Sequence, residues 1–169
     1  MFAKSNKQEL NIEGNPINKF ISLVSKIKPD QVTLVPDSID AITSNAGWDT
    51  IKNKNFLKEV ISEFKKNGIR TSIFVDPELK FIEGAKETGT DRIELYTESY
   101  ATNFEKGNLG EINKYIKASS LANKLGMKTN AGHDLNLQNI NYFVSKLPFL
   151  DEVSIGHAIV CESLYLGIE

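Results

Sequence analysis

A short β-like run followed by a helix-like stretch recurs six times in this sequence, and this alternation constrains the fold most. The expected strands are Leu10–Glu13, Gln31–Pro36, Thr71–Val75, Arg92–Thr97, Lys128–Ala131 and Glu152–Ile155. Repeated β-then-α units predict a parallel sheet covered by helices. No linker or composition shift divides the 169 residues. We therefore expect one α/β domain over residues 1–169, with 1–9 as a flexible or unrelated lead-in.

The segments between the strands carry the apolar spacing of amphipathic helices. In the first segment, Asn15 is expected to be the N-cap and Pro16 the first helical residue. The second, over 56–64, is expected to end at a left-handed Gly68. The triplet Asp76–Glu78 is expected to open the third helix. Further helices are expected over 112–125, 137–147 and 158–166.

Polar and apolar residues alternate along the expected strands, as Arg92 and Glu94 do with Ile93 and Leu95. A doubly wound sheet buries both faces, so its strands are nearly continuous apolar runs. A barrel with polar groups in its lumen gives alternation, and so does a sheet with one wet face. The pattern favours a (β/α)8 TIM barrel. Because such a barrel takes about 250 residues, we expect a partial barrel of about six βα units.

Composition and charge exclude several classes of function. The 20 basic and 22 acidic residues give a formal net charge of −2, which leaves no electrostatic footprint for nucleic acid. Apolar runs such as 20–24 are far shorter than the roughly 18 residues of a membrane span, and no secretory signal is recognised. The single Cys161 forms no internal disulfide and suits a reducing cytoplasm. We expect a cytoplasmic protein that binds neither nucleic acid nor membrane.

Strand parity places two carboxylates, Glu13 and Glu94, on the face opposite the helices. A carboxylate in a partly desolvated lumen has a raised pKa and can act as a general acid or base. The alternative for Glu94 is a structural ion pair with Arg92 or with Lys128 on the next strand.

The two histidines, His133 and His157, each follow a strand-ending glycine. Histidine is the most frequent general acid or base. A single histidine there would be interpreted as a cap residue, before a helix capped near Asp134 or Asn136. Two histidines at corresponding positions favour a functional site.

The glycines themselves, Gly132 and Gly156, allow close approach of a ligand to backbone amides at helix N-termini, which indicates an anion site. Turn formation is the alternative explanation. No metal is expected, because His133, His157 and Cys161 lack the paired spacing of zinc ligands. No nucleotide-binding or hydrolase glycine motif is present.

Seven segments together resemble the pyridoxine 5′-phosphate synthase family. They are Leu10–Pro16, Gln31–Asp37, Ile42–Asp49, Gly68–Asp76, Arg92–Thr97, Asn130–Leu135 and Ser154–Ala158. The resemblance implies a (β/α)8 barrel with extra helices, a homo-octamer, and a transferase that uses no metal or organic cofactor. It implies condensation of two phosphorylated small molecules, 3-amino-2-oxopropyl phosphate and 1-deoxy-D-xylulose 5-phosphate. The products are pyridoxine 5′-phosphate, phosphate and water, in vitamin B6 biosynthesis.

Carried over by position, the resemblance makes Glu13 a catalytic proton acceptor, His133 the proton donor and Glu94 a carboxylate that stabilises a transition state. The substrate- and phosphate-binding positions of the family fall on Thr43, Asp134, Gly156 and His157. Position 134 is glycine in many members. A carboxylate there would repel phosphate unless it points away.

The resemblance also implies that this sequence covers about two thirds of the enzyme. The family's first two βα units, with a further catalytic histidine and substrate-binding asparagine and arginine residues, are expected to lie outside it, as is the end of the last helix. The alternative is a non-catalytic phosphate-ligand binder or a degenerate homologue that has lost the chemistry. Turnover distinguishes the two functions.

Overall fold

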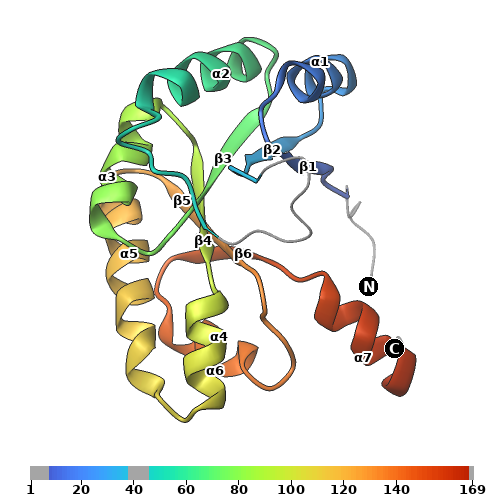
Figure 1. Ribbon diagram of the computed structural model, residues 1–169, viewed down its shortest axis with the longest axis vertical. Helices are drawn as coiled ribbons and strands as arrows, with labels where there is room; N and C mark the ends of the chain where they lie inside the picture. The colour runs from blue at the N-terminus through green and yellow to red at the C-terminus, as the bar shows by residue number, and fades with distance from the viewer. Residues whose placement is uncertain (1–7, 38–45, 168–169) are drawn as a thin grey trace, which may run out of the picture.

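The computed structural model describes residues 8–37 and 46–167 (Figure 1). The strands are β1 (Asn11–Gly14), β2 (Gln31–Leu34), β3 (Arg70–Val75), β4 (Arg92–Tyr96), β5 (Lys128–Gly132) and β6 (Leu150–Ser154). The α-helices are α1 (Asn18–Ile27), α2 (Lys54–Lys66), α3 (Leu79–Thr88), α4 (Glu98–Glu105), α5 (Ile112–Lys124), α6 (Ile140–Lys146) and α7 (His157–Leu166). Each expected strand is confirmed to within two residues.

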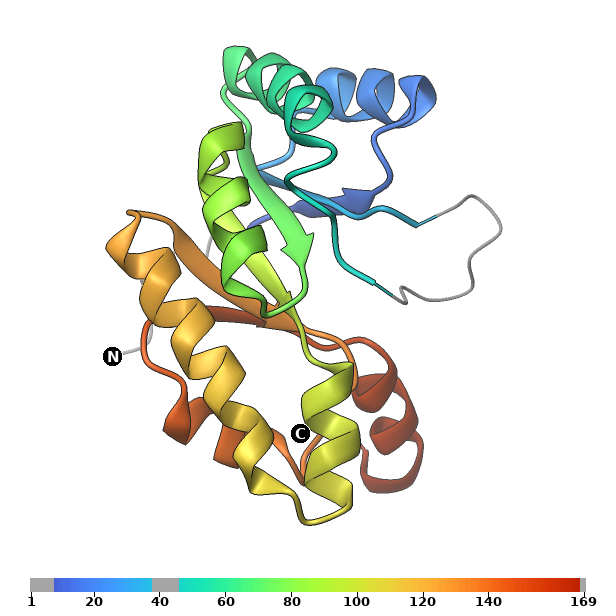
Figure 2. The same ribbon diagram turned by 60° about the vertical axis from the view of Figure 1, so that its left-hand side comes forward.

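The strands form one parallel sheet in the order β1-β2-β3-β4-β5-β6, so each strand pairs with its neighbours in sequence. A doubly wound sheet would reverse its order at a switch point. Here the order is sequential, and the sheet curls with α1, α2, α3 and α5 on its outer side (Figures 1 and 2). The predicted partial TIM barrel is confirmed. In the part of the chain described, β1 and β6 are the edges of the sheet.

The core lies between the outer face of the sheet and the helices. Alternate strand residues supply one side of it: Val32, Leu34, Ile73, Val75, Ile93, Leu95 and Ala131, all inaccessible to solvent. Helix residues supply the other, among them Leu57, Phe64, Ile82, Tyr115 and Ala118. Each large apolar side chain buried here contributes roughly 1.5–3 kcal/mol. The alternation leaves the opposite, inner face of the sheet to polar residues.

Two expected helix caps are wrong. Helix α1 has Ile17 at its N-cap position without a side-chain cap, and Asn15 instead donates from Nδ2 to the Asp37 carbonyl at 2.7 Å. Helix α3 begins only at Leu79. Asp76 accepts the Gly47 N–H at 3.1 Å. Each side chain forms its hydrogen bond with a residue of another loop rather than with the helix that follows it. Local sequence does not reveal such a partner.

Helix α4 was not expected from the sequence, because its eight residues present a short apolar face. It is held by Tyr100, whose ring lies 4.8 Å from that of Phe143 and 6.0 Å from that of Tyr115. The Tyr100 hydroxyl donates to the Asn139 carbonyl at 2.7 Å. Aromatic packing of this kind stabilises α4 against α5 and α6. It places α4 beside the carboxyl end of β5.

Aspartates join neighbouring strands at the amino-terminal end of the sheet. Asp30 and Asp91 directly precede β2 and β4, and Asp151 is the second residue of β6. Each carboxylate accepts a backbone N–H of the segment before it, from Leu10, Thr71 and Thr129 at 3.0, 2.9 and 3.0 Å. These bonds fix the register of strand pairs, and the sequence reading missed them. The available signal was a repeated pattern of Asp, a polar residue and an aliphatic residue.

Candidate active site

The inner face of the sheet buries a carboxylate. Glu94, on β4, is 2% exposed, and Ser154 on β6 donates a hydrogen bond to it. Its Oε1 lies against Gly132 on β5, where an added Cβ would clash with that oxygen and lie 3.0 Å from the Ser154 Cβ. Its Oε2 has no hydrogen-bond partner among the described residues. That oxygen is itself buried, so Glu94 has an unsatisfied hydrogen-bonding group inside the fold.

The alternative role of Glu94, a structural ion pair, is wrong. Arg92 binds Glu152 at 2.7 Å and the Asn130 Oδ1 at 2.9 Å, and Lys128 binds Asp151 at 2.8 Å. These pairs form the layer next to Glu94, nearer the amino-terminal end of the strands. Arg92 and Lys128, the two cations expected to pair with Glu94, are therefore paired with other carboxylates.

Burial, and after it the negative charge of Glu13, raise the pKa of Glu94 to about 8, against the opposing effect of the Ser154 hydrogen bond. For Glu13, neighbouring protein atoms remove solvation and raise the pKa. The charge of Asp37 raises it too, whereas His133 lowers it. Glu13 still has solvent access at the open side of the lumen. These interactions bring Glu13, Glu94 and His133 into one electrostatic cluster.

His133 follows β5 with a backbone φ of 91°, and Asp134 follows it with φ 58°. Both angles are uncommon for residues with a side chain. The imidazole Nδ1 lies 2.7 Å from the Asp134 Oδ2, and the ring packs edge-on against Tyr96 at 4.9 Å. Of the two expected cap positions, Asp134 is therefore wrong, whereas the Asn136 Oδ1 accepts the N–H groups of Gln138 and Asn139 at 2.9 and 3.1 Å in the turn that leads into α6. Helix α6 begins further on, at Ile140.

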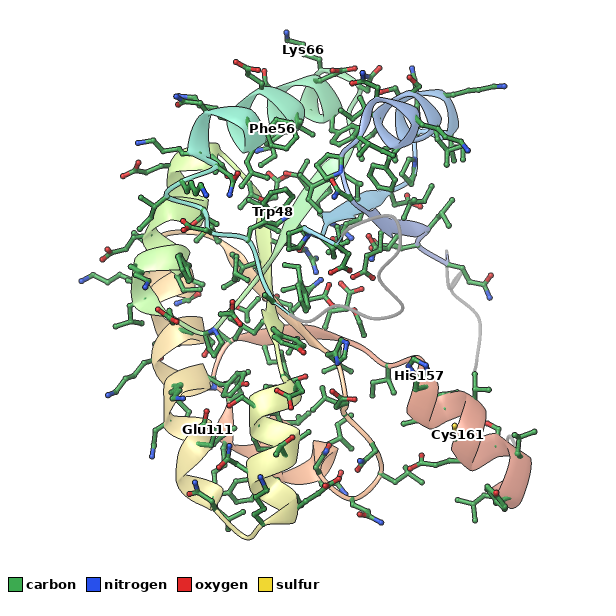
Figure 3. The ribbon with its side chains drawn as sticks, viewed as in Figure 1. Trp48, Phe56, Lys66, Glu111, His157 and Cys161 are labelled. Atoms are coloured by element: carbon green, nitrogen blue, oxygen red, sulfur yellow. The ribbon has the colours of Figure 1, made fainter. Side chains whose placement is uncertain are left out.

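The two histidines line the same hollow of about 450 Å³ between α4 and the start of α7, whereas Glu13 and Glu94 are not among its lining residues. Its lining is Glu98, Ala101, Thr102, Glu105, His133, Asp134, Leu135, Asn136, Ile155, Gly156, His157 and Ala158. Figure 3 shows His157 at the first turn of α7 and Cys161 one turn further along. Both strand ends therefore deliver their histidines to one side of the sheet.

Gly156 is the N-cap residue of α7, and a Cβ there would meet nothing within 4 Å. Backbone amides at such an N-terminus favour an anion. Gly132 is different, since it ends β5 and no helix begins directly after it. The expected amide site at Gly132 is wrong, and its lack of a side chain makes room for Glu94 instead.

Of the other expected site residues, Thr43 lies outside the described part of the chain. Within 8–37 and 46–167, no three His, Cys, Asp or Glu side chains are grouped to hold a metal ion. No helix among the described residues is long and apolar enough to cross a membrane. Sequence reasoning missed the contact of Ser154 with Glu94. Strand parity gave the signal, because Ser154 faces the lumen two residues before Gly156.

Comparison with known proteins gives a consistent result. The whole chain, residues 1–169, matches the family described as "Pyridoxal phosphate biosynthesis protein PdxJ". Pyridoxine 5′-phosphate synthase of Christiangramia forsetii is 64% identical over 161 residues, which are 95% of this chain and 68% of that protein. The synthases of Flavobacterium johnsoniae and Porphyromonas gingivalis are 65% and 55% identical over the same shares.

A solved structure shares the fold alone. D-psicose 3-epimerase, crystallised in the presence of D-fructose, superposes with a TM-score of 0.57 at 12% identity. The match covers 86% of this chain and 63% of that protein.

Proposed function

The chain belongs to the pyridoxal phosphate biosynthesis protein PdxJ family, and on that premise we propose that its lumen carries the acid–base groups of a pyridoxine 5′-phosphate synthase. The substrates would be 3-amino-2-oxopropyl phosphate and 1-deoxy-D-xylulose 5-phosphate. One observation carries the proposal: Glu13, Glu94 and His133 form one electrostatic cluster beside the hollow that Gly156 and His157 line.

The two carboxylates differ in a way that suits different roles. With its pKa near 8, Glu94 is mostly protonated at neutral pH and can donate a hydrogen bond to an oxygen that gains negative charge in the reaction. Glu13 has access to solvent. The charge of His133 also acts to lower the pKa of Glu13, against the effects of burial and Asp37, so Glu13 is the better proton acceptor. Ring closure with loss of water requires both kinds of group.

His133 is proposed to exchange a proton with the substrate, and α7 to hold a phosphate at its N-terminus. Gly156 and His157 present the first amides of that helix, where the helix dipole favours an anion. Glu98 and Glu105 also line the hollow and would repel a dianion that moves away from those amides. We place the Asp134 carboxylate on His133 rather than on the phosphate.

We also propose that the protein is cytoplasmic and homo-oligomeric. The single Cys161 is exposed and unpaired, which suits a reducing compartment. Apolar side chains of α7, such as Leu164 and Tyr165, are 80% and 89% exposed. Surfaces of that kind are typical of interfaces between subunits.

The division between binding and proton transfer can be tested by calorimetry with 1-deoxy-D-xylulose 5-phosphate. Gly156→Val should weaken binding at least about tenfold, because losing one charge-assisted hydrogen bond costs roughly 1.5–3 kcal/mol. His133→Asn should bind nearly as well as the parent chain, since its role is proton transfer. Equal losses in the two variants would contradict the assignment. If the chain, supplemented with the missing part of a synthase, binds the phosphate ester but forms no product, the result would instead support a non-catalytic binding protein.

A further inference from the structure

We propose that Asp134 is a positioning residue that holds His133 in the tautomer with the proton on Nδ1, leaving Nε2 to exchange a proton with the substrate. The inference deepens the proposed role of His133 and rests on it. It begins from the 2.7 Å contact between the His133 Nδ1 and the Asp134 Oδ2.

The chemistry of the contact fixes the direction of the hydrogen bond. An ionised carboxylate can only accept, so the proton must lie on Nδ1. In the neutral ring Nε2 then carries a lone pair and can take a proton, and in the charged ring it can give one back. A carboxylate that orients a catalytic imidazole in this way is a recurrent device in enzymes.

The backbone around the pair is built to maintain it. His133 and Asp134 both have positive φ, at 91° and 58°, a conformation that costs energy unless the surroundings impose it. The Thr97 hydroxyl lies within hydrogen-bond distance of both the Gly132 and the His133 carbonyls, and Asn139 donates from Nδ2 to the Asp134 carbonyl at 3.0 Å. Leu135 follows with 2% exposure.

The two residues that hold this backbone, Thr97 and Asn139, are themselves buried and hydrogen-bonded. Thr97 is inaccessible to solvent and Asn139 is 1% exposed, and the Asn139 carbonyl accepts from the Tyr100 hydroxyl at 2.7 Å. The strained pair is therefore held from both the α4 and the α6 sides. Tyr96, packed edge-on against the imidazole at 4.9 Å, restricts rotation of the ring. Strain that so many contacts maintain points to function rather than to a flexible surface turn.

Position 134 also provides a clean experiment. Glycine tolerates positive φ without strain, so Asp134→Gly removes the carboxylate while relieving the backbone. Asp134→Asn keeps the shape and a residue type that accepts this conformation, but it removes the charge. Glu98→Gln is the matched control, because it removes a carboxylate from the same hollow without touching the pair.

The measurement is long-range ¹H–¹⁵N correlation on the full chain with labelled histidine, at a pH where both rings are neutral. The chain has two histidines, so His157→Asn assigns the spectrum. We expect Nδ1–H for His133 in the parent chain and in Glu98→Gln. We expect a shift toward Nε2–H in Asp134→Gly, which removes the acceptor, and a smaller shift in Asp134→Asn, whose amide oxygen can still accept from Nδ1–H, with His157 unchanged. Circular dichroism confirms that each variant is folded.

A parent chain with His133 already in the Nε2–H form would overturn the proposal, as would a folded Asp134→Gly variant that retains Nδ1–H. The readout requires no turnover, so it separates this inference from the proposed function. If the tautomer depends on Asp134 but no assembly makes product, the positioning role stands and the synthase assignment fails.

Discussion

At the scale of single residues, Gly132 leaves room in the site for the Glu94 carboxylate. Gly132→Ala would push a methyl group into the Glu94 Oε1 and against Ser154. We expect a loss of about 1–3 kcal/mol in the free energy of unfolding, as for other overpacked cores. Gly156→Ala is the control, because its Cβ would enter open space. Urea denaturation of both variants checks this, and equal stabilities would show that Glu94 does not need the space.

The protonation of Glu94 links stability to pH. Its pKa is raised from an ordinary 4.5 to about 8, so the folded state favours the protonated form. The resulting stabilisation is complete below the ordinary pKa and disappears as pH rises through about 8. We expect the free energy of unfolding to fall across that range by an amount on the order of 5 kcal/mol. Glu94→Gln should lack this fall.

Glu13→Gln is an informative control for that measurement. The Glu13 charge is the second cause of the raised pKa of Glu94, so the fall in stability should become smaller and move to lower pH. A parent chain whose stability is flat between the two pKa values would exclude a neutral Glu94.

Strand parity was sufficient to predict which residues face the lumen, because side chains alternate strictly across a sheet. Glu94 was placed on the inner face for that reason, whereas His133 was predicted from its position directly after the strand-ending Gly132. Of the alternatives Asp134 and Asn136, it is Asn136 that accepts backbone N–H groups before α6. The caps at Asn15, Asp76 and Asp134 were predicted wrongly. Each of these side chains binds something that local sequence does not specify: two reach loops more than 20 residues away, and Asp134 binds its neighbouring imidazole.

At the scale of elements, paired strands are joined by aspartates at their amino-terminal ends. Asp91 accepts the Thr71 N–H at 2.9 Å and binds Lys65 at 2.7 Å. Burial raises the pKa of Asp91, but the hydrogen bonds from Lys65 and Thr71 outweigh it and the net pKa is lowered. The ionised carboxylate therefore stabilises the fold above its ordinary pKa, and this contribution disappears as pH falls through the lowered value.

We accordingly expect Asp91→Ala to lower the free energy of unfolding by about 1–2 kcal/mol at neutral pH, allowing for partial solvent screening. Asp91→Asn should lose less, because its amide oxygen can still accept from Thr71. Chemical denaturation at neutral and acidic pH checks both. A loss that stays constant into acid would argue against an ionic contribution.

Element type was predictable from sequence because six strands each precede a helix with its own apolar stripe. Helix α4 was missed because it lacks a periodic apolar stripe. It is stabilised instead by the packing of Tyr100 against rings on α5 and α6. Tertiary packing of this kind has no local sequence signal.

At the scale of the whole molecule, the described sheet has two edges, whereas a closed barrel has none. The β1 and β6 edges and the exposed apolar side chains of α7 offer surfaces for association. Six strands are also fewer than the eight of the (β/α)8 barrel. The chain matches 68% of the C. forsetii synthase. The remaining part of that protein can therefore be added to the chain as a separate polypeptide.

Turnover in a complementation assay shows whether the lumen carries the synthase chemistry. The present chain is mixed with a polypeptide carrying the part of the C. forsetii synthase outside the match, and pyridoxine 5′-phosphate is measured by mass spectrometry, with sedimentation velocity on the same samples. We expect association and no product from the chain alone, and product from the mixture. Glu13→Gln and His133→Asn should each reduce turnover about 10²–10⁴-fold, as for lost acid–base groups. A monodisperse monomer that makes product unaided, or a mixture whose turnover is indifferent to both substitutions, would contradict the account.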